Sequence, residues 1–191
     1  SIITVSLNAE RHIEQTIQSV LGQTWRPVEY IVVDGGSSDG TLSIINRYID
    51  RIDHSLSEKD EGIADAMNKG LSLATGDYVL FLQADDYFKR PDSLEQALSY
   101  VGDSDLIACD VEFGRSFSLH RPRGFTFWLN FKGLPHQGII CRRDLLNALS
   151  GFDRQFRICM DYDFLLRAYR RGARLVKAPV TLTVMRDTGI S

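Results

Sequence analysis

Two adjacent carboxylates, Asp85 and Asp86, are the residues of this sequence best suited to chemistry. They follow the apolar run 78–82, which is typical of a strand buried on both faces of a parallel sheet. Adjacent negative charges repel each other, and a hard divalent ion that also binds substrate phosphates would relieve this repulsion. Ligands of open α/β sheets bind at the carboxyl ends of strands, so we predict a site for a hard divalent metal ion at this turn. The alternative is a polar turn that binds no metal.

Polar residues also follow two other predicted strands. Asn8 and Asp34 each come at the end of a β-rich run. The carboxyl ends of parallel strands share one edge of a sheet, so we expect both residues to converge with Asp85 and Asp86 there. The Gly-rich loop 35–40 lets the backbone approach a ligand closely. This convergence favours a site for a metal and a phosphate-bearing ligand.

The first part of the chain alternates strictly between predicted strands and predicted helices. The strands cover residues 2–7, 28–33, 54–57 and 77–82, and the helices cover residues 13–21, 42–52 and 62–74. Such alternation indicates βαβ units with right-handed crossovers. We therefore predict an α/β fold with a mostly parallel sheet flanked by helices.

The later part of the chain is less regular. We predict helices over residues 91–98, 144–149 and from 160, strands over residues 105–111 and 137–141, and one or two strands over residues 175–184, broken at Pro179. Residues 112–135 show the weakest pattern. No repeat and no long linker divides the chain, so we expect a single domain over residues 1–191.

Composition excludes several classes of protein. The 191 residues carry a net charge of −3, which argues against a nucleic-acid partner. Cys109, Cys141 and Cys159 lie far apart, which rules out a complete disulfide framework and a CxxC metal pair. No apolar run approaches the ~20 residues of a membrane span, and no signal peptide is visible. We expect a cytoplasmic protein; because the chain starts at Ser1 inside a predicted strand, a fragment of a longer protein is compatible with the sequence.

Five segments form an ordered set of motifs along the first half of the chain. They are Thr4–Asn8, Gln18–Thr24, Val32–Thr41, Glu58–Gly70 and Gly76–Asp86. In this order they resemble family 2 glycosyltransferases with the GT-A fold, of the type found in bacterial polysaccharide biosynthesis. A looser match covers His136-Gln137 and Gly151–Arg167, whereas residues 112–135 match little.

The resemblance implies a fold and an activity. GT-A, the nucleotide-diphospho-sugar transferase fold, has a mostly parallel, Rossmann-like sheet flanked by helices. Its family 2 members move a sugar from a nucleotide-diphosphate donor, here expected to be a UDP-sugar, to an acceptor hydroxyl with inversion of the anomeric carbon. Residues 1–104 would form the nucleotide-sugar-binding half, and residues 105–191 the half for the acceptor and the catalytic base. The implied acceptor is a carbohydrate or a lipid-linked sugar.

The resemblance also implies roles for residues around the donor. Asp34 would read the uracil of UDP, with a turn-forming role as the alternative. The same nucleoside pocket would be lined by Ser6, Asn8, Glu10 and Asp60. Asp85 would face the ribose or the metal, and Asp86 would bind Mn²⁺ or Mg²⁺. Many relatives read Asp-x-Asp where this chain has Gln83-Ala84-Asp85, so one potential carboxylate is an amide.

Inversion by direct displacement needs a base that takes the proton of the acceptor hydroxyl. In the family, an acidic residue at the start of a late helix has this role. The matching residue is Asp161, with Asp163 as the second candidate. The alternative is that both carboxylates only stabilise the helix, through interaction with the positive end of its dipole. His136 would contact the diphosphate or the acceptor, and a capping or core histidine is the alternative.

Three other classes are weaker matches. A sugar nucleotidyltransferase would place a basic, Gly-rich phosphate loop after the first strand, where this chain has Asn8-Ala9-Glu10. A dinucleotide-dependent oxidoreductase would place GxGxxG there. A nucleotide-sugar-binding module without catalysis remains a non-enzymatic alternative, and Asp161 argues against it.

The irregular region holds an aromatic segment, residues 125–131. Its rings, and the arginines before it, are Phe125, Phe127, Trp128, Phe131, Arg121 and Arg123. The segment can pack beneath a loop, or it can form a partly exposed flap beside the acceptor site. Such a flap would stack on a sugar ring or touch the inner face of a membrane peripherally. Vesicle sedimentation distinguishes packing from membrane contact. If the flap touches lipid, the wild type should pellet with anionic vesicles, whereas the double variant Phe127→Ser/Trp128→Ser should stay folded and remain in the supernatant.

Overall fold

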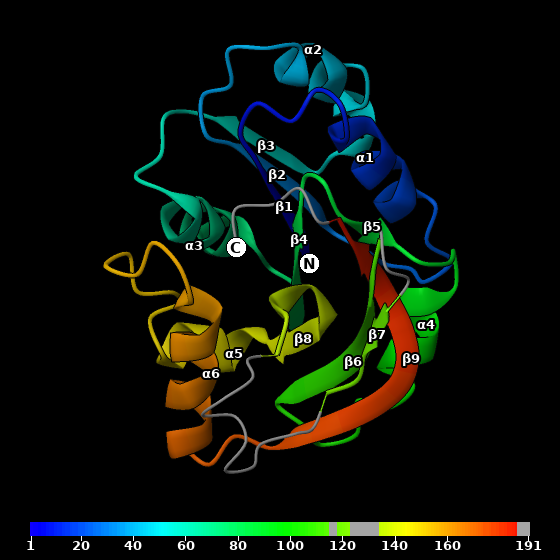
Figure 1. Cartoon of the computed structure of the whole chain (residues 1–191), viewed down its shortest axis with the longest axis vertical. Helices are drawn as coiled ribbons and strands as arrows, with labels where there is room; N and C mark the ends of the chain where they lie inside the picture. The colour runs from blue at the N-terminus through cyan, green and yellow to red at the C-terminus, as the bar shows by residue number, and fades with distance from the viewer. Residues whose placement is uncertain (115–117, 123–133, 187–191) are drawn as a thin grey trace.

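Four parallel strands form the first half of the sheet (Figure 1). The computed structural model describes residues 1–114, 118–122 and 134–186. The four strands lie side by side in the order β3-β2-β1-β4, and their three pairings are all parallel. Their bounds are Ile2–Ser6 for β1, Tyr30–Asp34 for β2, His54–Ser57 for β3 and Tyr78–Gln83 for β4. Their carboxyl ends therefore meet at one edge of the sheet, which is the arrangement that the sequence predicts.

The later strands extend the sheet beyond β4. They are β5 (Tyr87–Phe88), β6 (Leu106–Phe113), β7 (Ser118–His120), β8 (Ile139–Arg142) and β9 (Leu175–Met185). β8 lies between β4 and β6 and is antiparallel to both. β6 and β9 are parallel, whereas β5 pairs with β9, and β7 with β6, in antiparallel fashion. The α/β class is confirmed, with a parallel first half and a mixed second half.

Helices cover both faces of the sheet (Figure 1). One face carries α1 (Ile13–Leu21), α2 (Thr41–Asn46) and α4 (Ser93–Leu98), and the other carries α3 (Ile63–Leu73), α5 (Arg143–Ala148) and α6 (Met160–Arg170). β4 contributes to both cores: Val79 and Phe81 face α3, whereas Leu80 and Leu82 face α1. All four side chains are at most 4% exposed, which confirms the predicted strand buried on both faces.

Several predicted boundaries are shifted by one or two residues, and 3-10 turns alter two predicted elements. The predicted helix 42–52 is not continuous, because α2 ends at Asn46 and a 3-10 turn follows at Ile49–Arg51. The predicted strand 137–141 starts only at Ile139, after a 3-10 turn at His136–Gly138. A Cβ at Gly138 would lie 2.6 Å from the side chain of Val111, so this turn packs closely against β6.

The last strand continues through Pro179. Its pairing with β6 shifts register on both sides of Asp110. Proline has no N–H to donate, and a bulge lets the ladder resume beyond it. β5 and β7 are two and three residues long, which is too short for a hydrophobic pattern to predict them.

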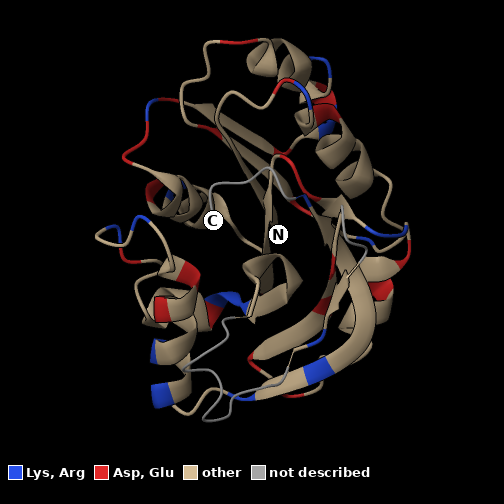
Figure 2. Ribbon diagram, in the orientation of Figure 1, with Lys and Arg blue, Asp and Glu red and all other residues tan. Residues whose placement is uncertain are grey.

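The remaining expectations concern charge, cysteines and membrane contact. Lys and Arg are interspersed with Asp and Glu over the ribbon (Figure 2). Cys109 and Cys141 are buried free thiols, and Cys159 is exposed. In residues 1–114, 118–122 and 134–186, no helix is long and apolar enough to cross a membrane. The aromatic segment 125–131 lies outside the described residues, so the predicted membrane-contacting flap stays a prediction.

Candidate active site

The turn after β4 buries one of its two carboxylates. Asp86 is 1% exposed, and both of its carboxylate oxygens accept hydrogen bonds. Gln137 Nε2 donates to Oδ2 at 2.9 Å, and the backbone N–H of Arg186 donates to Oδ1 at 3.1 Å. Thr16 Oγ1 donates to the Asp86 carbonyl at 2.7 Å. Asp85 is half-buried, so it is the more accessible acid of the pair.

The environment of this turn fits a divalent cation. Burial, and then the charge of Asp85, raises the pKa of Asp86 to about 7. A nearby cation would favour the ionised form of both carboxylates. Among the residues that the structure describes, no three His, Cys, Asp or Glu side chains gather as a metal site made of protein alone. A site of one or two carboxylates that substrate phosphates complete does not need such a group.

Arg186 also contacts this turn. Arg186 was not predicted from the sequence as part of the site. Its Nε donates to the Asp85 carbonyl at 2.9 Å, and its Nη2 donates to Gln15 Oε1. The guanidinium carbon lies 5.3 Å from the ring centre of Tyr87. Arg186 and Asp86 are 100 positions apart, so no local pattern connects them. Both the backbone and the side chain of Arg186 thus brace the turn from the end of β9.

Asp34 organises the loop that follows β2. Its carboxylate is buried and accepts the backbone N–H groups of Gly36 and Ser37 at 3.1 and 2.9 Å. It also accepts hydroxyl hydrogen bonds from Ser6, Ser37 and Ser57. This is the turn-forming role that the sequence left open for Asp34. Its predicted contact with a nucleobase stays a prediction.

Contacts between two loops place Asn8 and Glu10. Asn8 Oδ1 accepts the backbone N–H of Ser38 at 2.9 Å, and Glu10 Oε2 accepts that of Gly40 at 2.8 Å. Asn8 adopts φ +50°, a left-handed conformation that asparagine tolerates better than most residues. The loop after β1 is therefore joined to the loop after β2.

Asp60 approaches the same place from the loop before α3. A Cβ at Gly35 would lie 2.1 Å from Asp60 Oδ2, so only glycine permits this close approach. Asp60 Oδ1 accepts the backbone N–H of Gly62 at 2.9 Å. A continuous set of contacts thus brings the predicted nucleoside-binding residues together: Ser6, Asn8, Glu10, Asp34 and Asp60.

His136 and Asp161 are in contact, although the sequence predicts each of them separately. His136 Nδ1 lies 3.2 Å from Asp161 Oδ2, and His136 Nε2 lies 3.0 Å from Gln83 Nε2. Gln83 is the last residue of β4, directly before the turn that holds Asp85. The side-chain exposure is 15% for His136 and 27% for Asp161. The candidate base is thus joined to the candidate metal turn through one imidazole and one amide.

The surroundings of the two late carboxylates favour Asp161 over Asp163 as the base. Burial raises the pKa of Asp161, but hydrogen bonds from His136 and from the Tyr162 backbone outweigh burial, so that its pKa lies below the usual value. Asp161 is therefore ionised at neutral pH, which is the protonation state that a general base requires. Asp163 instead forms an ion pair with Arg167 at 2.8 Å, one helical turn away. Arg167 also donates to the carbonyl of Gly151 at 2.9 Å, which gives this pair a structural role.

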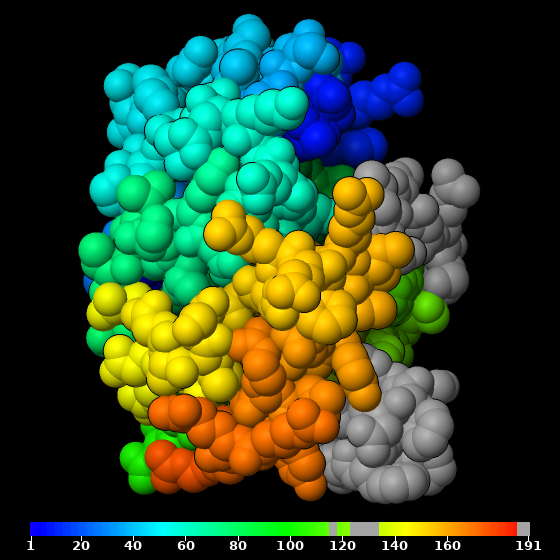
Figure 3. All heavy atoms as spheres, turned by 90° about the vertical axis from the view of Figure 1, so that its left-hand side faces the viewer, coloured from blue at the N-terminus to red at the C-terminus, as the bar shows by residue number. Residues whose placement is uncertain are grey.

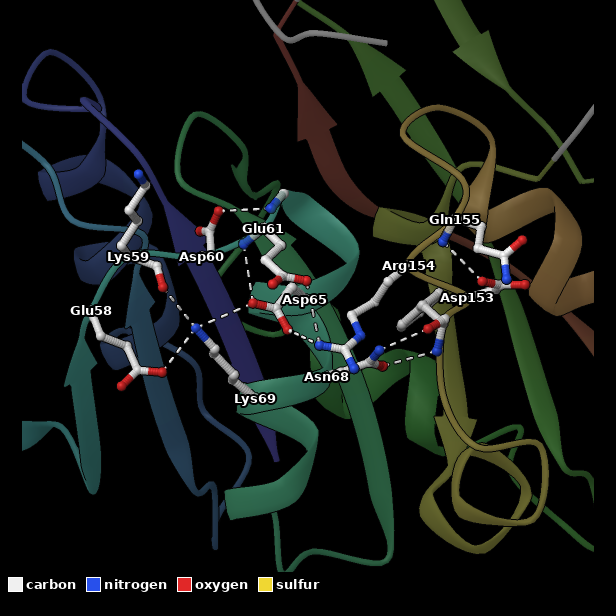
Figure 4. A network of polar contacts seen from close by, with 12 residues as sticks. Glu58, Lys59, Asp60, Glu61, Asp65, Asn68, Lys69, Asp153, Arg154 and Gln155 are labelled. Atoms are coloured by element: carbon white, nitrogen blue, oxygen red, sulfur yellow. Dashed lines mark hydrogen bonds and ion pairs between the residues drawn. The ribbon is translucent and has the colours of Figure 1, made fainter.

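A polar network connects the loop before α3 to the segment before α6 (Figure 4). Asp65 on α3 forms ion pairs with Lys69 at 3.2 Å and with Arg154 at 3.1 Å. Lys69 also pairs with Glu58 at 2.8 Å, in the loop that carries Asp60. The loop before α3 and the segment that leads into α6 are therefore both fixed to the same helix.

The segment before α6 lies at the surface against α3 (Figure 3). Asn68 Nδ2 donates to the Phe152 carbonyl at 2.7 Å, and the Phe152 N–H donates to Asn68 Oδ1 at 2.9 Å. The centre of the Phe152 ring lies 5.1 Å from that of Phe81 on β4 and 5.4 Å from that of Phe164 on α6. A groove of about 730 Å³ opens beside this joint, and none of the predicted site residues lines it. The candidate active site therefore lies at the sheet edge and apart from this groove.

Asn68→Ala is expected to lower the free energy of unfolding by about 1–3 kcal/mol, because it leaves the N–H and C=O of Phe152 without their partners. Urea denaturation measures the change. Ser72→Ala is the matched control, since Ser72 lies exposed on the same helix and should change stability by at most about 0.5 kcal/mol. Equal effects of the two substitutions would contradict the role of Asn68 as a joint.

Comparison with known proteins identifies the family. The model described as "Glycosyl transferase family 2" matches residues 1–173. Two similar proteins are both named "PGL/p-HBAD biosynthesis glycosyltransferase", one from Mycobacterium bovis (strain BCG / Pasteur 1173P2) and one from Mycobacterium tuberculosis (strain ATCC 25177 / H37Ra). Each is 34% identical, over 93% of this chain and 72% of its own length.

Similar solved structures show the same fold. S. aureus TarS in complex with UDP has a TM-score of 0.82 and 21% identity, over 97% of this chain and 59% of TarS residues 1–349. The mannosyltransferase PcManGT from Pyrobaculum calidifontis, in complex with GDP-Man and Mn²⁺, has a TM-score of 0.75 and 25% identity, over 96% of this chain and 55% of its own. The chain thus spans less than two thirds of each solved chain. The expected GT-A fold is confirmed, and the chain belongs to glycosyltransferase family 2.

Proposed function

We propose that this chain transfers a sugar from a nucleotide-diphosphate donor, with a UDP-sugar as the first candidate, to an acceptor hydroxyl with inversion of the anomeric carbon. The acceptor would be a carbohydrate or a lipid-linked sugar in the synthesis of a polysaccharide or another cell-surface glycan. Membership of glycosyltransferase family 2 supports the reaction class. The donor, the stereochemistry and the acceptor are proposals.

The position of Asp161 carries this proposal. Asp161 lies in the first turn of α6 and contacts His136, which contacts Gln83 at the end of β4. The turn with Asp85 begins one residue later. An inverting displacement needs a base on one side of the reacting carbon and stabilisation of the leaving diphosphate on the other. The arrangement of Asp161 and the turn supports this division of roles.

Asp85, with Asp86 beside it, would hold Mn²⁺ or Mg²⁺. Such an ion, when bound, neutralises the negative charge that develops on the leaving diphosphate. We place Asp85 first, since it is half-buried and therefore more accessible to an ion than Asp86, which is 1% exposed. PcManGT was solved with Mn²⁺, which supports a metal in this fold.

The donor nucleoside would bind where the loops after β1 and β2 meet. The similar solved structures contain different nucleotides, since TarS was solved with UDP and PcManGT with GDP-Man. We propose a uracil base for this chain because Asp34 occupies the position that reads uracil in relatives. Five hydrogen bonds already reach the Asp34 carboxylate, so a base N–H would replace one of those from the loop.

The proposed function is tested with a panel of nucleotide sugars, first by thermal shift with and without Mn²⁺ and then by turnover in the presence of hydroxyl acceptors. We expect release of a nucleoside diphosphate and a glycoside whose anomeric configuration, measured by NMR, is opposite to that of the donor. Consumption of added pyrophosphate, with release of a nucleoside triphosphate and a sugar 1-phosphate, would instead indicate a nucleotidyltransferase. Binding of a donor without any turnover would indicate a non-catalytic module.

A further inference from the structure

We propose that Gln83 and His136 are positioning residues for the base, with Gln83 holding the imidazole of His136 and His136 donating an N–H to Asp161. The proposal rests on the role of Asp161 under the proposed function. It assigns a role to the amide that stands where many relatives have the first carboxylate of Asp-x-Asp. In this chain the amide would serve the base and not the metal.

The atoms in contact define one arrangement of protons. The Asp161 carboxylate only accepts hydrogen bonds, so His136 Nδ1, at 3.2 Å, carries the proton between them. The amide nitrogen of Gln83 only donates, so His136 Nε2, at 3.0 Å, accepts. Together these contacts fix a neutral ring with its proton on Nδ1. A partner on one ring nitrogen commonly sets the proton on the other.

This contact orients the carboxylate of Asp161. Its Oδ2 faces His136, and its Oδ1 accepts the backbone N–H of Tyr162 at 2.8 Å. Both oxygens are therefore held, which fixes the plane of the carboxylate toward an incoming hydroxyl. A base held in place loses less entropy when the substrate arrives.

An amide and a carboxylate at position 83 have different consequences for the ring. A carboxylate could only accept, so Nε2 would need a proton in addition to the one on Nδ1. The resulting imidazolium beside Asp161 would stabilise the charged carboxylate and weaken it as a proton acceptor. With Gln83, one proton on the ring satisfies both contacts, so that His136 acts on Asp161 through a hydrogen bond and not through a second ring proton.

The test compares two substitutions that each keep one of the two contacts. In His136→Asn the amide nitrogen can take the place of Nδ1 and still donate to Asp161. In His136→Gln the longer side chain reaches the place of Nε2 and keeps only the contact with Gln83. We expect His136→Asn to retain most of kcat and His136→Gln to lose about 10-fold or more, the scale seen when a partner that orients a functional side chain is removed. The donor KM should stay within about 2-fold of the wild type in both, because the effect acts on the base.

A second pair of variants tests Gln83. Gln83→Leu removes the amide at similar size and should lower kcat, but should add little to the loss in a His136→Gln background, because both substitutions break the same chain of contacts. Gln18→Leu is the matched control, since Gln18 is exposed on α1 away from this contact. Melting temperature and UDP binding verify that each variant is folded.

The outcomes separate this inference from the proposed function. The positioning role would be overturned if His136→Asn and His136→Gln had equal kcat, or if the substitutions raised the donor KM instead of lowering kcat. Adding His136→Gln to Asp161→Asn should cause no further loss, and a further loss would mean that His136 contacts the substrate directly. If Asp161→Asn itself keeps full activity, the base assignment fails first and the role of Gln83 and His136 fails with it.

Discussion

Asp161→Asn is expected to lower the rate of sugar transfer by about 10²-fold or more, the scale of general-base catalysis. The amide keeps the size of the carboxylate but cannot take the proton of the acceptor hydroxyl. The proposed nucleoside site lies elsewhere on the sheet edge, so we expect the affinity for UDP to change little. Single-turnover transfer and calorimetric UDP titration measure the two quantities separately.

Asp163→Asn is the matched control for this substitution. It lies two residues further along α6 and pairs with Arg167, so it should reduce stability modestly and leave the chemical step within about 3-fold of the wild type. The reverse pattern, with a slow Asp163→Asn enzyme and an active Asp161→Asn enzyme, would assign the base to Asp163.

Removal of the divalent metal is expected to abolish most of the stabilisation that UDP gives to the wild type. Ion and diphosphate complete each other's coordination, so Mn²⁺ or Mg²⁺ with UDP should raise Tm far more than UDP with EDTA. A ligand at 100 times its Kd adds about 2.7 kcal/mol to the free energy of unfolding, so the rise in Tm should be readily measurable. Differential scanning fluorimetry over a metal titration measures it.

Asp85→Asn should eliminate this dependence on metal, and Asp86→Asn should weaken it less, because Asp86 is buried and hydrogen-bonded within the protein. Asp103→Asn, on an exposed turn, controls for the loss of one negative charge. A shift with UDP in the wild type that is the same in Mn²⁺ and in EDTA would exclude the metal assignment.

The sequence by itself determined the parallel half of the sheet and the edge at which the site lies. The apolar runs of β1, β2 and β4 are long enough to predict, because a strand buried on both faces cannot contain polar residues without a large cost. Asn8, Asp34 and Asp85 then meet at one edge, since parallel strands have a common direction. The ordered motifs extended this prediction to the family, which comparison confirms.

The second half of the sheet was less predictable. The direction of β8 depends on the 3-10 turn before it and on the neighbours that pair with it, and neither feature is encoded in the few residues of the strand. The bulge that carries β9 past Pro179 depends on the partner strand β6. Such features come from pairing between distant segments, which local patterns do not contain.

Only the tertiary structure decided which partners the candidate site residues have. It showed that Asp86 is buried against Gln137, that Arg186 braces the turn, and that His136 contacts both Asp161 and Gln83. These partners are separated by 25 to 101 positions. The type of a residue limits what it can do, but its pKa, its burial and its partners depend on what the fold brings beside it.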